Sequence, residues 1–482
     1  MSITRRDFLT GLFTQPAITQ SQAISPIHHL LNRASWGVRP DELARAEAMG
    51  VEAYLDEQLN PDSIDDSALD ERLRQIPLLH MDRHAVYSVQ DHEYRAWQAM
   101  VKGMVWRATY SNRQLFERVV EFWSDHFNIS GDDFTADNLI YQREAIRTHA
   151  LGNFRDMLFA TAKSPAMLTY LDNYINIADA PNENYARELL ELHTLGVDGG
   201  YTEQDIKETA RAFTGWTVHN GARTGFYFDG NEHDTDVKTI LGHKLPANRG
   251  IEDGLHVLAI VANHPATARF VCGKMARRFV SDNPPASLIE SMVQVWQVTN
   301  GDIKAIVRHL FLSEEFAASA GQKMKRPLHF LIGALRATGT EVTNWWTLEQ
   351  ILLDLGQPPY GWGPPDGYPD TADAWISTNG LLARWNTAML LTHTAYEDGY
   401  ESDAGVRTTR LFEQIGQPKT ATDLVNAIAT HVFGAPLANP SPFIDYVTDG
   451  SGKNTPVTPH LLAKKAASLY GLMLASPQYQ WR

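Results

Sequence analysis

Residues 181–196 read PNENYARELLELHTLG, and this stretch decides the fold class. Its apolar side chains, among them Tyr185, Leu189 and Leu192, recur at the three- and four-residue spacing of a helix, with a proline before them and a glycine after them. Charged side chains fall on the opposite face of such a helix. The stretch therefore predicts an amphipathic helix over about 183–196 that buries one face.

Helical patterns of the same kind cover most of the chain. They extend over about 92–110, 112–127, 143–150, 153–163, 164–172, 252–263, 265–281, 285–298, 302–318, 326–338, 371–398, 420–432 and 458–475. Thr202 and Asp205 have the spacing of a capping box, which predicts a further helix to about Gly215. We therefore expect a mainly α fold, built as a large multi-helix array.

Two segments interrupt the helical pattern. In residues 217–245, Gly, Asn and Asp separate short aromatic or β-branched runs, which predicts an irregular or short β excursion with one hairpin. Residues 357–370 read QPPYGWGPPDGYPD, and so many prolines and glycines exclude both a helix and a central strand. We expect a shaped Pro/Gly-rich loop there.

The length of the chain bounds its organisation. At 482 residues it exceeds the size at which a single hydrophobic core usually keeps growing. We expect residues 26–482 to form either a single large helical domain or two lobes divided near 217–250.

Residues 1–25 have the features of an export signal. Arg5 and Arg6 precede a modestly apolar segment that begins at Phe8, and residues 21–23 offer a small-residue cleavage site. These features predict a twin-arginine leader and a periplasmic or secreted protein. The alternative is a basic N-terminus without an address function, on a cytoplasmic protein.

Composition narrows the range of partners. The formal net charge of −15 repels phosphate backbones, so we expect no nucleic acid partner. No window approaches the roughly 18 consecutive apolar residues of a membrane-spanning helix, so we expect no transmembrane segment. The lone Cys272 cannot form a disulfide within the chain.

The polar face of the amphipathic helix is the first candidate site. Glu188 and Glu191 are candidate catalytic carboxylates. Asn182, Asn184 and Arg187 are candidate ligand-binding residues. Clustered carboxylates can hold a hard divalent cation or keep one of their number protonated. Alternatively, the four-residue spacing about Arg187 produces an exposed, salt-bridged surface.

A second candidate site lies in EFWSDHF, residues 121–127. Glu121 and Asp125 are four residues apart and share a helical face, so they form a candidate acid and base pair. Asp125 and His126 are also candidate ligands of a divalent metal. The alternative is a helix-end aspartate beside a core histidine, without a catalytic function.

Aromatic side chains of the irregular segments form a third candidate site. Tyr360, Trp362 and Tyr368, with Asp366 beside them, are candidate residues of a stacking platform for a sugar or another flat ligand. Trp216, at the start of the other irregular segment, is a further candidate ligand-binding residue. The alternative is that these aromatic side chains seal an edge of the core.

Three familiar catalytic motifs are absent from the sequence. It contains no G-x-S-x-G, no complete Walker A motif and no G-x-G-x-x-G after a strand. These absences argue against a serine hydrolase of that type, a nucleotide hydrolase and a dinucleotide-dependent enzyme of the Rossmann type.

Seven segments spread over the chain share a common pattern. They are HLLNRASWG at 29–37, EFWSDHF at 121–127, ALGNFRD at 150–156, the stretch 181–200, ARAFTGW at 210–216, HPATA at 264–268 and PDGYP at 365–369. This pattern resembles the bacterial domain-of-unknown-function 1800 family over nearly the whole chain after the leader. The resemblance implies an exported protein encoded beside proteins similar to alkaline-phosphatase-like sulfatases, and a shared task on an anionic polymer or glycan. It assigns no catalytic residue.

Two functional hypotheses follow. The first is an exported hydrolase that acts on an extracytoplasmic glycan or anionic polymer through clustered carboxylates, with or without a divalent metal. The second is a non-catalytic accessory or glycan-binding protein that partners a sulfatase-like enzyme through the aromatic loop.

Overall fold

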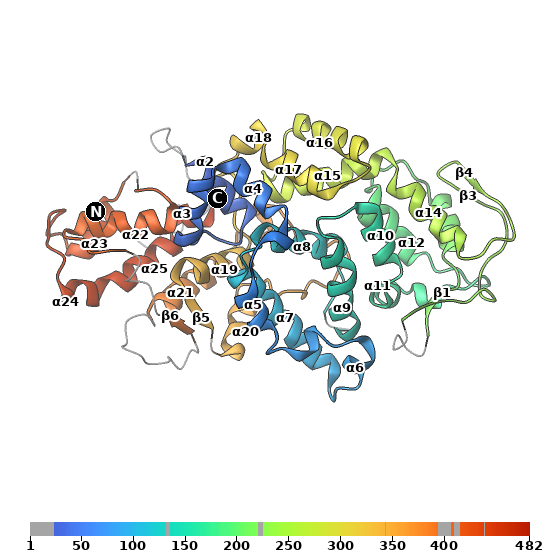
Figure 1. The fold of residues 1–482 in the computed structure, drawn as a ribbon, viewed down its shortest axis with the longest axis horizontal. Coiled ribbons are helices and arrows are strands. Elements are labelled where there is room, and N and C mark those ends of the chain that lie inside the picture. The colour runs from blue at the N-terminus through green and yellow to red at the C-terminus, as the bar shows by residue number, and fades with distance from the viewer. Residues whose placement is uncertain are drawn as a thin grey trace.

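The computed structural model describes residues 24–131, 135–219, 225–342, 344–393, 406–408, 415–437 and 439–482, and the expected leader lies almost entirely outside them. The described part is mainly α with short two-stranded sheets, as expected. It forms an elongated body, with the C-terminal helices at one end and the β-hairpins at the other (Figure 1). None of its helices is both long and apolar enough to cross a membrane.

Helices fill the first part of the chain. Their bounds are α2 (Pro26–Ala34), α3 (Pro40–Met49), α4 (Val51–Gln58), η1 (Pro61–Ser63), α5 (Ser67–Leu73), η2 (Pro77–Leu79), α6 (Arg83–Tyr87), α7 (His92–Tyr110), α8 (Gln114–His126), α9 (Thr135–Tyr141) and the π-helix η3 (Gln142–Arg147).

Short strands interrupt the helices of the middle part. The elements are α10 (Phe154–Ala162), α11 (Pro165–Tyr170), η4 (Asn173–Ile175), α12 (Asn184–Glu188), the π-helix η5 (Leu189–Thr194), α13 (Glu203–Ala212), β1 (Trp216–Val218), β2 (Phe226–Phe228), β3 (Lys238–Ile240), β4 (His243–Leu245), α14 (Glu252–Ala262), α15 (Pro265–Phe279), α16 (Ala286–Thr299), α17 (Ile303–Phe311) and α18 (Glu314–Ala317).

The last part of the chain is again helical. Its elements are α19 (Pro327–Thr338), β5 (Thr340–Val342), α20 (Trp345–Asp354), η6 (Ala372–Ala374), α21 (Thr378–His393), β6 (Val406–Thr408), α22 (Ala421–Phe433), α23 (Ser441–Thr448), α24 (Pro459–Leu461), the π-helix η7 (Leu462–Ala466), α25 (Ala467–Ala475) and α26 (Pro477–Gln480).

The amphipathic helix of residues 183–196 forms, but its type changes along its length. α12 continues into η5, whose hydrogen bonds span five residues instead of four. The wider turn rotates the side chains that follow. As a result Thr194 is buried, although α-helical spacing would place it on the polar face, and Leu192 is partly exposed. The capping box of Thr202 and Asp205 at the start of α13 is confirmed.

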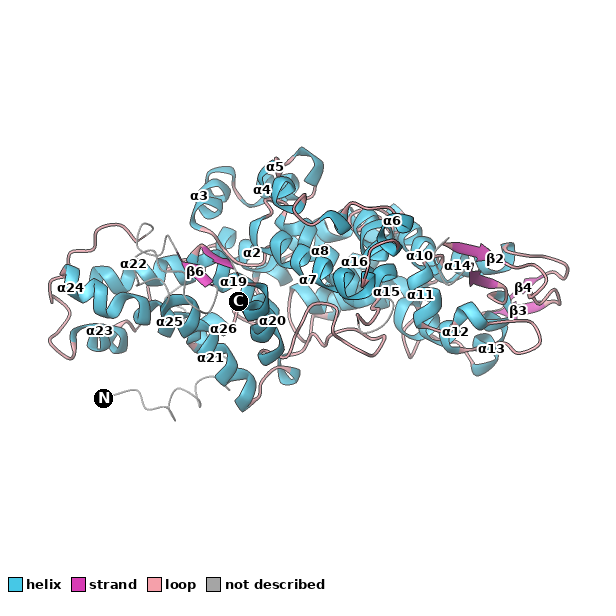
Figure 2. Cartoon of the chain, turned by 90° about the horizontal axis from the view of Figure 1, so that it is seen from below, coloured by secondary structure: helices cyan, strands magenta, loops and turns pink. Residues whose placement is uncertain are grey.

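Residues 217–245 contain more β structure than the sequence predicts. Besides the β1–β2 pair, β3 and β4 form a tight antiparallel hairpin with Ile240 opposite His243. Its two turn residues, Leu241 and Gly242, have φ of 50° and 79°, as a turn with two left-handed residues requires. The expected short β excursion is confirmed, and the second hairpin was not expected because leucine is a rare first residue of such a turn. A third pair, β5 with β6, was not predicted either (Figure 2).

Two large groups of buried apolar side chains make up most of the core. The first surrounds α8 and includes residues between Ile27 and Phe316, on both sides of the 217–250 segment. The second joins α7 and α19 to α21, α22 and α25. The first group thus joins helices that precede the 217–250 segment to helices that follow it.

Candidate functional site

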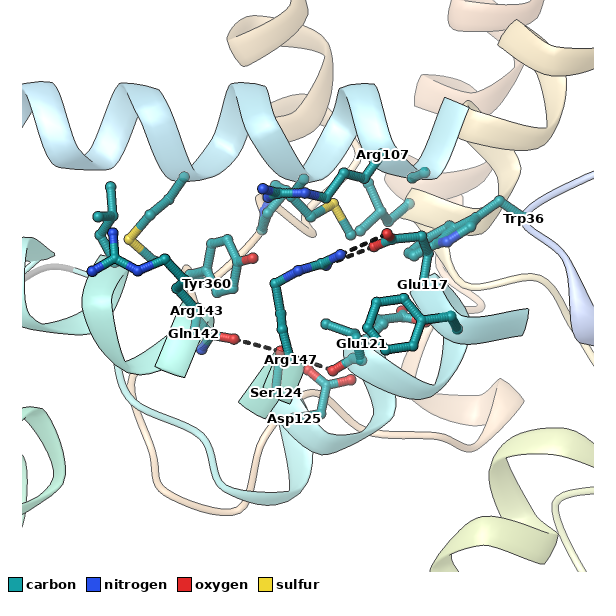
Figure 3. Close-up of a pocket in the computed structure, with 18 of the residues that line it drawn as sticks. Trp36, Arg107, Glu117, Glu121, Ser124, Asp125, Gln142, Arg143, Arg147 and Tyr360 are labelled. Carbon is teal, nitrogen blue, oxygen red and sulfur yellow. Dashed lines mark hydrogen bonds and ion pairs between the residues drawn. The ribbon is translucent and has the colours of Figure 1, made fainter. Parts of the chain in front are cut away.

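A cavity of about 400 Å³ lies against α7, α8, η3 and the Pro/Gly-rich loop of residues 357–370 (Figure 3). Acidic and basic side chains both line it. The charged lining residues are Arg107, Glu117, Glu121, Asp125, Arg143, Arg147 and Arg326. Tyr360 and Tyr368 of the loop complete one side. The structure thus brings two of the three predicted sites together in one place.

Glu121 is the centre of a buried group of charges. Its carboxylate forms ion pairs with Arg118 and Arg326 and accepts a hydrogen bond from Nε2 of His329 at 2.7 Å. Burial alone would raise the pKa of this carboxyl, but Arg326, His329, Arg118 and Arg278 together hold it well below its usual range. These contacts favour the ionised form of Glu121, which suits an electrostatic role better than that of a proton donor.

The tautomer of His329 follows from its two partners. Nδ1 accepts a hydrogen bond from Arg482 at 2.9 Å, which places the ring proton on Nε2, where it faces Glu121. Arg118 also lies 2.5 Å from Nε2 and shares the same carboxylate. Burial, and then the charge of Arg118, lower the pKa of His329 well below its usual value. The ring is neutral and orients the carboxylate.

Asp125, one helical turn after Glu121, has one engaged oxygen and one free oxygen. Oδ2 accepts hydrogen bonds from Arg278 at 2.6 Å and Arg326 at 2.8 Å. Oδ1 accepts no hydrogen bond from any residue that the structure describes, and the side chain is 15% exposed. Of the carboxylates that line the cavity, Glu117, Glu121 and Asp125, only Asp125 has an oxygen that accepts no hydrogen bond within the described part of the chain.

Arg147 and Arg107 occupy the part of the cavity nearer α7. Arg147 forms a bidentate pair with Glu117, with both N–O distances 2.7 Å. Arg107 forms no hydrogen bond or ion pair within the described part of the chain. Burial, and then the charge of Arg147, lower the pKa of Arg107 to about 10, so it is still charged at neutral pH.

Backbone contacts hold the Pro/Gly-rich loop against the end of α8. The side-chain amide of Asn128 donates to the carbonyl oxygens of Trp362 and Pro364 at 3.0 and 2.8 Å. The amide of Gly131 donates to the carbonyl of Tyr360 at 2.8 Å. Tyr360 has a φ of 61°, a conformation that bulky residues rarely adopt outside constrained sites. The loop thus fixes the Tyr360 ring, whose hydroxyl points into the cavity (Figure 3).

The π-helix η3 provides another side of the cavity. Gln142, Arg143 and Arg147 all line it, and they come from this one widened turn. Gln142 accepts a hydrogen bond from the Ser124 hydroxyl at 2.7 Å, which ties η3 to α8. Such widened turns occur frequently at functional sites.

The other residues of the aromatic loop have different surroundings. Tyr368 is buried and lines the cavity, while Trp362 packs on it with ring centroids 5.1 Å apart. The indole N–H of Trp362 donates to Asp366 at 2.8 Å. Trp362 and Asp366 are outside the cavity lining, so they form an outer edge beside it.

The predicted carboxylates of the amphipathic helix do not join the cavity. Glu191 and Glu183 flank Arg187 at 3.5 and 3.4 Å, which is the salt-bridged arrangement of the alternative interpretation. Burial, and then the charge of Glu191, raise the pKa of Glu188. Glu188 and Glu191 are not among the residues that line the cavity, although the charge of Asp366, at the edge of the Pro/Gly-rich loop, also raises the pKa of Glu188.

Asn182 and Asn184 stabilise the start of the same helix. The Asn182 side-chain oxygen accepts from the amide of Asn184 at 2.9 Å, and Asn184 contacts Asp172 at 3.4 Å. These contacts are those of a turn, and they explain both asparagines without a ligand.

Trp216 is a core residue rather than a ligand-binding one. It is 0% exposed and packs between Phe213 and Phe226, with ring centroids 5.0 and 5.1 Å away. The aromatic side chain seals the base of the first hairpin, so its prediction as a binding residue was wrong.

His126 faces away from the charges that surround Asp125. Its Nε2 lies 3.0 Å from the carbonyl oxygen of His193, and its ring packs among Phe122, Trp123 and Phe127. Burial lowers the pKa of His126 well below its usual range. Among the described residues no three His, Cys, Asp or Glu side chains are grouped as metal ligands. The structure gives no support for a metal site shared by Asp125 and His126.

The arginines of the site were not predicted. One pattern could have indicated them: Glu117, Glu121 and Asp125 follow one another at four-residue spacing, without a basic residue at the same spacing between them. Buried carboxylates need cations. Arg118 of α8 supplies one of them to Glu121, and Arg147 and Arg326 come from outside this helix. No pattern in the sequence marks Arg107.

Comparison with known proteins places the chain in a family. Neither the curated proteins nor the solved structures contain a match to it. The family model described as protein of unknown function (DUF1800) matches residues 29–481, nearly the whole chain. The chain therefore belongs to the DUF1800 family.

Proposed function

We propose that this protein is a hydrolase that cleaves a glycan or anionic polymer in the cavity beside α8, with Asp125 as its general base. The observation that carries the proposal is the free Oδ1 of Asp125, on a carboxylate whose other oxygen is held by Arg278 and Arg326. An oriented carboxylate with one free oxygen is the arrangement that deprotonates water.

The proposed reaction needs one carboxylate. Oδ1 of Asp125 takes a proton from water as the water oxygen bonds to the scissile carbon. In the same step the bond from that carbon to the departing oxygen breaks. The departing oxygen takes a proton from solvent water, and Asp125 afterwards releases its proton to solvent. Glu121 keeps the surrounding arginines in place, because its own carboxylate is fully paired and ionised. Divalent metal is not part of this proposal.

The test is cleavage of a panel of polysaccharides, with neutral dextran, polygalacturonate, alginate and chondroitin sulfate as substrates and new chain ends as the readout. Asp125→Asn is expected to lower turnover by roughly 100-fold or more, because a general base contributes about that much. Glu290→Gln, which alters only an exposed pair with Arg269, is the control and should retain activity. Equal turnover by Asp125→Asn and wild type would overturn the proposal.

A non-catalytic accessory function is the second candidate. The partly exposed Trp362, fixed by Asp366 at the edge of the cavity, favours it, because a rigid indole is a common stacking surface for sugars. If none of the polymers is cleaved, but one binds and Trp362→Ala weakens that binding, this candidate replaces the hydrolase. Co-purification with a sulfatase-like protein would then identify the proposed partner.

We also propose that the protein acts outside the cytoplasm, because Arg5 and Arg6 precede an apolar segment. Residues 1–25 fused to a reporter that works only after folded export should produce a signal. The signal should disappear when both arginines are changed to lysine.

A further inference from the structure

The charges that line the cavity do not cancel. Glu117 pairs with Arg147, and Glu121 and Asp125 pair with Arg326 and its neighbours. Arg143 donates to the Met81 carbonyl at 2.7 Å and pairs with Glu144. After these pairs are formed, Arg107 is left as a cation without a counter-ion in the described part of the cavity.

An unpaired guanidinium is costly to bury. Transfer of a charge out of water is unfavourable unless a partner compensates it, and the lowered pKa of Arg107 reflects this cost. Arg107 is also close to a second cation, since the charge of Arg147 lowers its pKa further. The charge of Glu117 offsets part of the repulsion between these two arginines, and a bound anion would relieve the rest.

The Tyr360 hydroxyl completes the same corner of the cavity. It has no hydrogen-bond partner among the residues with described positions, and Figure 3 shows it directed toward the space beside Arg107. Burial raises the pKa of Tyr360 to about 12, so the hydroxyl keeps its proton and can donate it in a hydrogen bond. The left-handed backbone at Tyr360 keeps the ring in this position.

We propose that Arg107, Arg147 and the Tyr360 hydroxyl form a subsite for one oxyanion of the substrate, the carboxylate or sulfate group of a charged sugar. The guanidinium fork of Arg107 matches two oxygens of such a group. The subsite rests on the proposed function and narrows its substrate class from any glycan to one that carries negative charge. It also explains how a chain with a formal net charge of −15 binds an anion, since the attraction is local.

Binding of small probes tests the subsite without any turnover. Calorimetric titration of the full protein with glucuronate, glucose 6-sulfate and glucose compares two oxyanions with their neutral parent. We expect at least one charged probe to bind at least 10-fold more tightly than glucose. The charged probe with the higher affinity identifies the group that the subsite prefers. Binding of neither charged probe, or equal binding of all three sugars, would overturn the proposal.

Two variants separate recognition from folding. Arg107→Gln should weaken the charged probe at least 10-fold and raise the thermal midpoint, because it removes a half-buried charge without a hydrogen-bonded partner. Arg143→Gln is the matched control in the same cavity. It should lower the thermal midpoint, because it breaks bonds to Met81 and Glu144. Unchanged probe affinity in Arg107→Gln would contradict the subsite.

The subsite and the proposed hydrolysis can fail separately. If Arg107→Gln abolishes probe binding but Asp125→Asn leaves turnover unchanged, the subsite stands and the catalytic assignment of Asp125 is wrong. If Asp125→Asn abolishes turnover of neutral dextran and Arg107→Gln binds the probes as wild type does, the catalytic assignment of Asp125 stands and the subsite is wrong.

Discussion

Glu117 of α8 and Arg147 of η3 face each other through both oxygens and both terminal nitrogens, at 2.7 Å for each contact. Glu117 is almost fully buried, and Arg147 lies over the Phe116 ring at 5.1 Å. This pair joins two helices that line the cavity, and it fixes the guanidinium that we assign to the oxyanion subsite.

Glu117→Gln is expected to destabilise the protein. Removal of one partner leaves the other charge poorly compensated, which costs about 3 kcal/mol for a largely buried pair. Urea unfolding measures the change. The exposed pair of Glu183 and Arg187 provides the control, since Glu183→Gln should cost less than about 1 kcal/mol. Similar losses of unfolding free energy in the two variants would mean that the pair of Glu117 and Arg147 stabilises the protein no more than an exposed ion pair does.

Stability should fall in mild acid, below pH 6.5. Burial is the main reason that the pKa of His28 is about 4 and that the pKa values of His29 and His193 are about 3. Below pH 6.5 the unfolded chain binds protons at these positions and the folded protein does not. Their stabilising contribution is therefore complete above pH 6.5 and is lost as the pH falls toward the folded pKa values.

Each such histidine is expected to contribute about 1.4 kcal/mol per pH unit to the slope. Urea unfolding at pH 8, 7, 6 and 5 measures it. His193→Gln should reduce the slope by about 1.4 kcal/mol per pH unit. A free energy of unfolding that stays constant from pH 7 to pH 5 would contradict the prediction.

Gly367→Ala should displace the Pro/Gly-rich loop. Gly367 has a φ of 76°, and a Cβ atom there would lie 2.1 Å from the Asp125 carbonyl oxygen. We expect a loss of stability of about 2 kcal/mol or more and weaker binding of the oxyanion probe, because the loop carries Tyr360. Gly363→Ala, in open space on the same loop, should change neither quantity.

Trp216→Ala should affect stability alone. The side chain is fully buried in the core, so its truncation should cost about 3–5 kcal/mol. Trp362→Ala should cost much less, because this ring is only half-buried. Thermal unfolding compares the two variants. If Trp216→Ala were more stable than Trp362→Ala, the assignment of Trp216 to the core and of Trp362 to the cavity edge would be wrong.

The helices are predictable from the sequence because they depend on residues close together in the chain, through apolar spacing and capping. α7, expected at 92–110, runs from His92 to Tyr110, and the capping box at Thr202 forms as its spacing implies. The change to a π-helix at Leu189 was not predictable, because it depends on how the two ends of the segment pack on other helices. Helical periodicity in a sequence corresponds to one constant rotation per residue about the helix axis. Between α12 and η5 this rotation changes.

The candidate site could be predicted only in part. Asp125 and Tyr360 were selected because a carboxylate four residues after another, or an aromatic ring between prolines and glycines, is visible in the sequence. Arg107 and Arg326 were not selected. Their positions in the cavity depend on contacts with residues far away in the chain, such as the pair of Arg326 and Glu121, which are 205 positions apart.

Arg33 of α2 has consequences for the timing of folding. Its guanidinium donates to the carbonyl oxygens of Val280, Ser319 and Arg482, and the last of these lies 449 positions along the chain. The ribosome makes Arg33 early and Arg482 late, so the full set of contacts cannot form until Arg482 has been made. An export system that accepts only folded proteins would therefore act after Arg482 has been made. An export system that moves an unfolded chain would act before the contact between Arg33 and Arg482 exists.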